Sequence, residues 1–400
     1  TDRLIGSTQT NKNKSTVGPF EIYNADSTSS IRFQLAGQLR MTLDSRDKGG
    51  DADRTNTLFM EARRLRLTLS GTIYDPDISY KVHLSTAPKS LELMDFYFNY
   101  RLKANLQFRY GQYKTPFTRY RIQSFQRLTF VDWAIVTKYF GAERQMGLAL
   151  HNGYEKPPKW GYVFGLFTGV NARASHAVGL AKVYGEETAN PSDLSESGAT
   201  ADYHPELFLH CSYNANNIQL NSNSDAERTG WRYSFGISSA FDMHPTDYQD
   251  FRLRLAPEIL IKYRGVAIVG AGYAGYSELD NGSEMELTMT GCLIQTAYRF
   301  HDDYEISIRY ALVDFQKGLT DDASERALQL IDDSGDDPEI INQYKNAGKI
   351  LQENELTLGF SIYLLGHSLK WQSDFGWLRH CYDDENRDDY LARSQFQVSF

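Results

Sequence analysis

Residues 390–400, Tyr-Leu-Ala-Arg-Ser-Gln-Phe-Gln-Val-Ser-Phe, separate into two chemically different faces if they form a β-strand. Successive side chains of a strand point to opposite sides. An apolar residue recurs on one side and a polar residue on the other: Tyr390, Ala392, Phe396, Val398 and Phe400 against Arg393, Gln395, Gln397 and Ser399. This pattern, ending on an aromatic residue, predicts a strand that closes a membrane-embedded barrel, because its outer face would meet lipid.

The same two-residue period begins near residue 31 and recurs along the chain. Residues 31–43 alternate over their whole length, which no helix would do. We therefore predict an all-β fold, a transmembrane antiparallel β-barrel of 16 strands with an inward-folded third loop. The expected strands lie near residues 31–43, 58–70, 78–86, 92–102, 104–113, 144–152, 160–170, 204–213, 229–241, 250–263, 266–277, 285–300, 303–315, 354–365, 368–379 and 390–400.

Short and long connections alternate between these strands. Tight turns are expected at 103, 264–265, 301–303 and 366–367, and long loops at 44–57, 114–143, 171–203, 316–353 and 380–389. Outer-membrane barrels have short turns at the periplasmic rim and long loops at the outer rim. Only the connection 214–228 fits poorly, because it should be short and is not. The predicted organisation is a flexible arm over 1–30 and a barrel over 31–400.

Composition supports this class and excludes others. The chain is 41% hydrophobic, yet its mean hydropathy is −0.50, and no run of 18 apolar residues exists to form a membrane-spanning helix. A large soluble all-β domain is the alternative that the strand count disfavours. The first residues lack the features of a signal peptide, which indicates a processed chain. The net charge of −9 argues against nucleic-acid binding, and Cys211, Cys292 and Cys381 show no metal spacing.

Two loops differ in character. Loop 316–353 is acidic, and the run 332–337 could be interpreted as a calcium site, although a solvated acidic surface loop is the interpretation we favour. Loop 114–143 is basic and rich in aromatic residues. Because so apolar a loop should not extend into water, we expect it to fold into the barrel and to narrow the lumen as a constriction loop.

Two segments carry a recognisable motif: the run 59–71, with consecutive arginines at Arg63 and Arg64, and the run Gly111-Gln-Tyr-Lys-Thr-Pro-Phe117. The first resembles the second strand of the phosphate-selective porin O and P family, and the second is the most specific match to that family. The clear likeness covers residues 30–152. It implies a sixteen-stranded outer-membrane channel, a homotrimer, an inward third loop and basic residues along the passage. Lysine is sparse in the strands here, so the likeness supports a porin more strongly than it supports phosphate as the solute.

Alternation alone assigns the charged side chains to a face. Leu65, Leu67 and Leu69 make one side of their strand, so Arg64 and Arg66 make the other. A charge facing lipid at mid-bilayer costs about 2–4 kcal/mol, which turns the arginines toward the lumen. The same reasoning, with the cations of loop 114–143, predicts a pore-lining set for small anions: Arg32, Arg40, Arg64, Arg66, Lys81, Arg109, Lys114, Arg119, Arg121, Arg127 and Lys138. Alternatively, each cation pairs with an acid such as Asp44, Glu61 or Asp95 and only solvates the wall.

These observations predict a porin of the bacterial outer membrane that passes small solutes by passive diffusion and prefers anions, phosphate among them. Its expected partners are membrane lipid and lipopolysaccharide, and no cofactor, metal or catalytic residue is expected. The run Gly270-Ala-Gly-Tyr-Ala-Gly275 matches a dinucleotide fingerprint, but a strand rather than a helix continues from it. The alternative function is a structural or docking barrel within a larger envelope complex.

Overall fold

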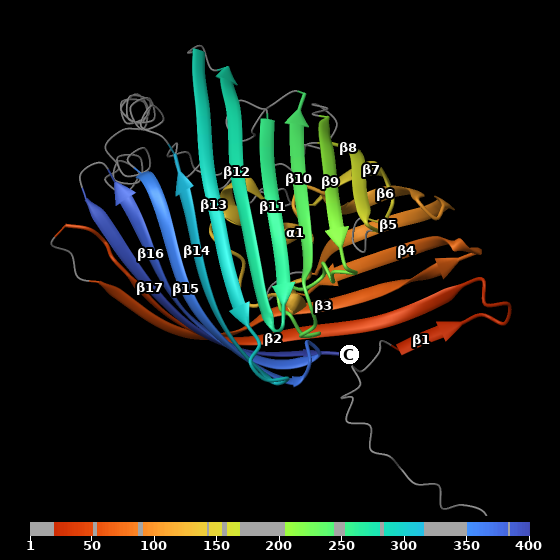
Figure 1. Ribbon diagram of the computed structural model, residues 1–400, viewed down its shortest axis with the longest axis horizontal. Coiled ribbons are helices and arrows are strands. Elements are labelled where there is room, and N and C mark those ends of the chain that lie inside the picture. Colours follow the sequence, from red (N-terminus) through yellow and green to blue (C-terminus); the bar gives the residue numbers. More distant parts are fainter. Residues whose placement is uncertain are drawn as a thin grey trace, which may run out of the picture.

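The computed structural model describes residues 20–50, 54–86, 91–141, 144–153, 158–168, 205–243, 253–280, 284–315, 350–382 and 385–400. Sixteen strands, β2 to β17, each pair antiparallel with the next, and β17 pairs with β2 to close a barrel (Figure 1). The predicted sixteen-stranded barrel is therefore confirmed, and each expected strand corresponds to one strand of the structure. No helix in the described part of the chain has the length and apolarity to cross a bilayer.

The strands of the first half are β2 (Ser30–Arg46), β3 (Thr55–Ile73), β4 (Asp75–Ser85), β5 (Glu92–Lys103), β6 (Leu106–Lys114), β7 (Arg144–His151), β8 (Trp160–Phe167) and β9 (Glu206–Ala215). Those of the second half are β10 (Arg232–Asp242), β11 (Leu253–Tyr263), β12 (Val266–Asp280), β13 (Glu284–Tyr298), β14 (Tyr304–Asp314), β15 (Ile350–Leu365), β16 (Leu369–Tyr382) and β17 (Asn386–Ser399). Between β6 and β7 lie α1 (Arg119–Ile122), a 3-10 turn (Phe125–Arg127) and α2 (Val136–Phe140).

Burial follows the two-residue period that the sequence shows. On β2, Gln38, Arg40 and Thr42 are buried, whereas Leu39, Met41 and Leu43 are exposed. On β17, Gln395, Gln397 and Ser399 are buried, and the aromatic and apolar set faces outward. This distribution, with apolar side chains exposed and polar ones buried, is the reverse of that in a soluble protein. It suits a barrel wall with lipid outside and water inside. Phe400 completes the closure, because its N–H and C=O bond to Leu35 at 3.0 and 2.8 Å.

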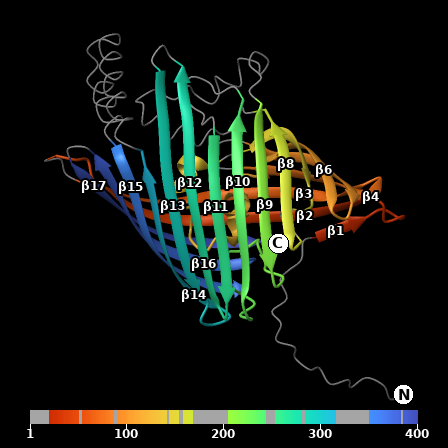
Figure 2. The ribbon, with the colours of Figure 1, turned by 45° about the horizontal axis from the view of Figure 1, so that its top comes forward.

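One strand was not predicted. Residues 20–23, which the sequence analysis assigned to the arm, form β1 (Phe20–Tyr23), and β1 pairs antiparallel with the first residues of β2. β1 lies along the same edge of β2 as β17, beyond the point where β17 ends. It is therefore near the C-terminal end of the chain (Figure 2). Arg32 fixes this pairing through an ion pair with Glu21 at 3.0 Å. Residues 316–349 of the expected acidic loop, including 332–337, lie outside the described residues, as do residues 1–19, whereas its last four residues, 350–353, begin β15.

Two bulges change which residues face inward. The β2–β3 register pairs Gln38 with Arg64 but Leu39 with Ala62, which leaves Arg63 as the extra residue. The inward set of β3 therefore changes from Glu61, opposite Arg40, to Arg64, opposite Gln38. Arg64 is buried, and Arg63 is exposed beside Glu61, with 3.6 Å between the charged groups. A similar shift occurs between β4 and β5, where His83 pairs with Asp95 but Leu84 pairs with Leu93, so Met94 is the extra residue. A bulge re-aims side chains locally, so a strict period fails at these points.

The interior is not polar all round. On β9 to β14 many inward positions carry apolar residues, which pack with residues from the connections β6–β7 and β9–β10 into one cluster. Wall residues of this cluster include Phe208, Leu260, Val269, Tyr273, Met289, Leu293 and Val313. This cluster fills part of the barrel interior with apolar side chains.

Candidate permeation site

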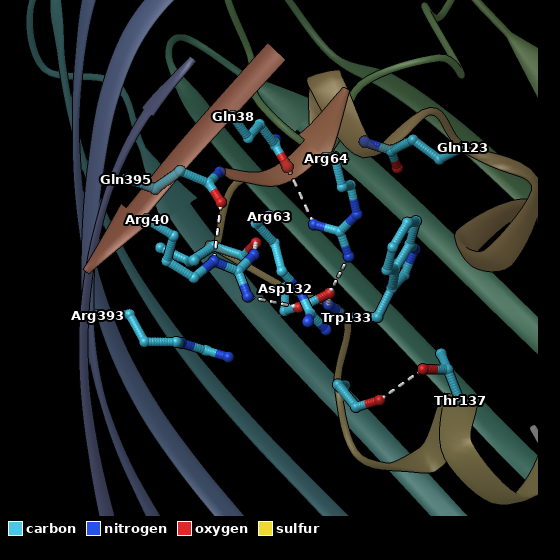
Figure 3. A network of polar contacts seen from close by, with 12 residues as sticks. Gln38, Arg40, Arg63, Arg64, Gln123, Asp132, Trp133, Thr137, Arg393 and Gln395 are labelled. Atoms are coloured by element: carbon cyan, nitrogen blue, oxygen red, sulfur yellow. Dashed lines mark hydrogen bonds and ion pairs between the residues drawn. The ribbon is translucent and has the colours of Figure 1, made fainter. Parts of the chain in front are cut away.

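The segment between β6 and β7 (residues 115–141, the β6–β7 segment) is held by ion pairs with the inner wall (Figure 3). Asp132 lies 3.0 Å from Arg40 of β2 and 3.0 Å from Arg64 of β3. Gln395 and Gln38 accept further bonds from the same two guanidiniums at 3.0 Å each. Burial alone would raise the pKa of Asp132, but the charges of Arg64 and Arg40 outweigh it and hold that pKa well below its usual range.

The same segment also contacts the wall on the other side of the β17–β2 closure. The N–H of Val131 donates to Asp374 of β16 at 3.1 Å, and that of Ile135 donates to Glu355 of β15 at 2.6 Å. Lys370 of β16 donates to the carbonyl of Leu128 at 2.9 Å. The side chains of Asp374, Glu355 and Lys370 are buried and face inward. The backbone of the segment is thus fastened by charged hydrogen bonds to strands from both sides of the barrel closure.

Aromatic residues of the segment occupy hollows left by wall glycines. Phe140 stacks on Tyr273 with 5.3 Å between ring centroids and covers Gly291, where a Cβ would lie 2.7 Å from the ring. Phe130 covers Gly359 in the same way, at 2.9 Å. Side chains larger than hydrogen at these positions would displace the rings. The small residues are therefore part of how the segment is seated.

One cavity lies beside the segment, and a second cavity adjoins the first. The first, of about 290 Å³, lies among β4–β7, β9–β11 and residues 119–127, and the second, of about 820 Å³, lies among the short-turn ends of β1–β7. Lys81, Tyr97 and Arg109 line both, so this is where the cavities meet. Arg109 lies over the rings of Tyr97 and Tyr113 at 4.4 and 5.3 Å from their centroids, an arrangement that holds the guanidinium in place.

Basic groups predominate around the smaller cavity. Its charged lining consists of six basic residues and two acidic ones: Lys81, Arg109, Lys114, Arg119, Arg127 and Arg144, against Asp95 and Glu258. Asp95 is 4% exposed and lies 3.1 Å from Lys81 and from His83, and 2.5 Å from Arg144. One carboxylate thus fixes three of the side chains, and the balance of the lining is positive.

The predicted pore-lining residues fall into two groups. Lys81, Arg109, Lys114, Arg119 and Arg127 line the smaller cavity, and Arg32 lines the wider one, bonded to Glu21. Arg40 and Arg64 instead pair with Asp132, Arg66 is buried in the wall, Arg121 lies over the Trp133 ring at 4.7 Å, and Lys138 donates to Tyr139 at 2.7 Å. The alternative of acid pairing thus describes Arg40 and Arg64, whose partner is Asp132 of the segment. It also describes Lys81, which pairs with the wall residue Asp95, and Arg32, which pairs with Glu21.

Sequence reasoning did not select Arg144, which the structure places in the cavity lining. Strict alternation would group it with Met146, Leu148 and Leu150 on the outer face of β7. It lies at the first residue of the strand, where the chain arrives from the β6–β7 segment, and its side chain turns inward to Asp95. Alternation places the charge of Arg144 on the lipid side at the end of a strand, which is unfavourable. That conflict is the sequence signal that could have identified Arg144 as an inward-turning residue.

A closed antiparallel barrel of sixteen strands with an apolar exterior and a charged, partly open interior defines an outer-membrane channel for small solutes. Solved structures of outer-membrane proteins share that fold at low sequence identity. The outer membrane channel DcaP of Acinetobacter baumannii is 13% identical with a TM-score of 0.58, covering 96% of this chain and 100% of its own. OprB of Pseudomonas putida is 12% identical with a TM-score of 0.59, covering 92% and 94%. The anion-selective porin of Comamonas acidovorans is 11% identical with a TM-score of 0.55, covering 92% and 100%.

The family model for phosphate-selective porin O and P matches residues 33–248, which is more than half of the chain. The chain belongs to this family. No curated protein matches it in sequence. Family and fold together give a bacterial outer-membrane channel rather than an enzyme.

Proposed function

We propose that this channel prefers small anions, which diffuse passively through the two adjoining cavities. The observation that carries the proposal is the excess of basic over acidic side chains around the smaller cavity, with Lys81 and Arg109 at the junction. At about 5 Å, one unit charge changes the energy of a permeating ion by about 1–3 kcal/mol at effective dielectric constants of about 20 to 80. A positive lining therefore lowers the barrier for anions and raises it for cations.

The chemistry of the lining suits oxyanions and small carboxylates. A guanidinium offers parallel N–H donors that match two oxygens of phosphate or carboxylate. The family description names phosphate, and one solved relative is described as anion-selective; both statements concern those proteins, and they support the proposal without deciding the solute. Phosphate is accordingly one candidate among several anions of this kind.

We further propose that the β6–β7 segment is the constriction of the channel and that the protein assembles as a homotrimer in lipid and lipopolysaccharide. The first proposal is supported by the contacts of the segment with inward-facing residues of β2, β3, β15 and β16. The second is supported by family membership. Arg119 and Arg127 reach the smaller cavity from this segment, so its position sets part of the charge that a solute meets.

Planar-bilayer recording of the purified protein tests the preference for anions. In a potassium chloride gradient, the reversal potential should have the sign of chloride permeation. Phosphate added to chloride should reduce the current at low concentration if a specific site exists, and only in proportion to its share of the ions otherwise. A reversal potential of the opposite sign contradicts the proposal. An absence of conductance steps would instead favour the alternative of a docking or structural barrel.

A further inference from the structure

The turn between β9 and β10 (residues 216–231, the β9–β10 turn) is long although it belongs to the short-turn rim. Its middle part is buried rather than solvated: Asn223, Ser224 and Asp225 are 1%, 2% and 1% exposed. Ile218 and Leu220 belong to the apolar cluster inside the barrel. A turn that hung from the rim would expose these residues to water. This burial explains why the length of the connection does not fit the pattern of short periplasmic turns.

Contacts with inward-facing residues of β11 and β14, and with the turn between β11 and β12, fix the position of the β9–β10 turn. Ser224 donates to Glu305, a buried residue on the inner face of β14. Lys262 of β11 donates to the carbonyl of Gln219 at 2.7 Å, and the N–H of Gly265 donates to Asp225 at 2.8 Å. Removing one partner of a buried charged group strongly destabilises a protein, so these hydrogen bonds hold the turn in place.

The turn also holds one cation of the β6–β7 segment. Arg119 donates from Nη1 to the side-chain oxygen of Asn223 at 2.8 Å and approaches the carbonyl of Leu220 at 3.5 Å. Its own N–H donates to Glu258 of β11 at 3.0 Å. Leu220 and its neighbour Asn221 line the smaller cavity together with Arg119. The two connections, which enter from opposite rims, therefore meet at the wall of the passage.

We propose that the β9–β10 turn is a second constriction element, which narrows the passage from the periplasmic side and positions the Arg119 guanidinium beside it. The inference rests on the channel function and does not depend on which ions the channel prefers. Asn223 is a positioning residue: it fixes the direction of a charge that the solute meets. Loss of its amide leaves the guanidinium free to move and widens the passage.

Single-channel recording of Asn223→Ala tests the role in permeation. Compared with wild type, the variant should show a larger and noisier conductance and a shifted reversal potential. Asn217→Gly is the matched control, because Asn217 lies on the same turn, is exposed, and has a φ of 53° that glycine adopts without strain. Heat-modifiable migration on gels checks that both variants are folded. Equal conductance and equal reversal potential in folded Asn223→Ala and Asn217→Gly would overturn the proposal.

Cross-linking tests the position of the turn independently of transport. In a background with Cys211, Cys292 and Cys381 changed to Ser, the pair Ser224→Cys and Glu305→Cys should be joined by a short bifunctional thiol reagent. The control pair, Ser224→Cys with Ile306→Cys, should not be joined, because Ile306 is exposed on the outer face of the same strand. Absence of the first cross-link, or equal yields for both pairs, overturns the placement. If wild type itself does not conduct, the channel function fails and the cross-link still decides the placement.

Discussion

The carboxylate of Asp132 lies 3.0 Å from the guanidinium of Arg64, joining the middle of the β6–β7 segment to β3. Arg40 of β2 shares the same carboxylate. We expect Asp132→Asn to destabilise the protein by about 3 kcal/mol, at the lower end of the range for a broken buried ion pair, because two buried cations lose their partner. Denaturant unfolding in detergent measures this change, and channel noise should rise with it. Asp302→Asn is the control. The ion pair of Asp302 with Arg228 is exposed, so its loss should lower the free energy of unfolding by less than about 1 kcal/mol.

The stability difference between wild type and Asp132→Asn should depend on pH in one direction. Because the pKa of Asp132 is held well below its usual range, the stabilisation is fully present above the unfolded value of about 4 and is lost as the pH falls below it. We expect a constant difference from pH 8 to pH 5 and a decreasing one below about pH 4. Unfolding curves of both proteins across this range measure it. A difference that already fell between pH 7 and pH 6 would mean that another group controls the segment.

Arg109 lies where the two cavities meet, so its charge should influence ion selection. We expect Arg109→Gln to move the reversal potential toward zero in a salt gradient, since about 1–3 kcal/mol of attraction for an anion is removed. Arg379→Gln is the control. Arg379 pairs with Asp388 and lines neither cavity, so its loss should leave the reversal potential unchanged. Similar shifts in both variants would indicate a general charge effect rather than a lining residue.

Gly359 provides the space that Phe130 of the β6–β7 segment occupies. We expect Gly359→Ala to cost about 1–3 kcal/mol by overpacking and to raise the conductance, because an added Cβ would clash with both Ser307 and the Phe130 ring, and the ring must move. Gly37→Ala is the matched control on β2, where an added Cβ would lie 3.8 Å from its nearest neighbours, an ordinary contact. Thermal unfolding and single-channel recording of the two variants measure the contrast. An unchanged conductance in folded Gly359→Ala would show that Phe130 does not set the width.

The barrel could be predicted because its signal is local. Each strand repeats a pattern of two residues, and the pattern on β2 and β17 agrees with the burial found there. The signal fails where the backbone departs from a regular pleat, as at Arg63, where one extra residue separates the two inward sets of β3. It also fails at strand ends such as Arg144, whose direction depends on the segment that precedes it. The short strand β1 has too few residues for a period to be recognised.

The candidate site could be predicted only in part. The face of Lys81 and Arg109 followed from alternation, and both line the cavities. Arg40 and Arg64 also face inward, but Asp132, which is distant in the chain, takes up their charge. The chain therefore carries two kinds of inward arginine that look alike in sequence. Their difference lies in the partner, and the partner is a matter of three-dimensional position.

The amino-acid order by itself determined the strands, their faces and the closed barrel, because the pleat of a single strand and the cost of exposing charge to lipid act on neighbouring residues. Only the tertiary structure decided which inward side chains pack into the apolar cluster, which cations line the cavities, and that the β9–β10 turn is buried against inward-facing residues. These outcomes depend on contacts such as Asn223 with Arg119 and Ser224 with Glu305. Such contacts join residues that are far apart in the chain, so no local pattern records them.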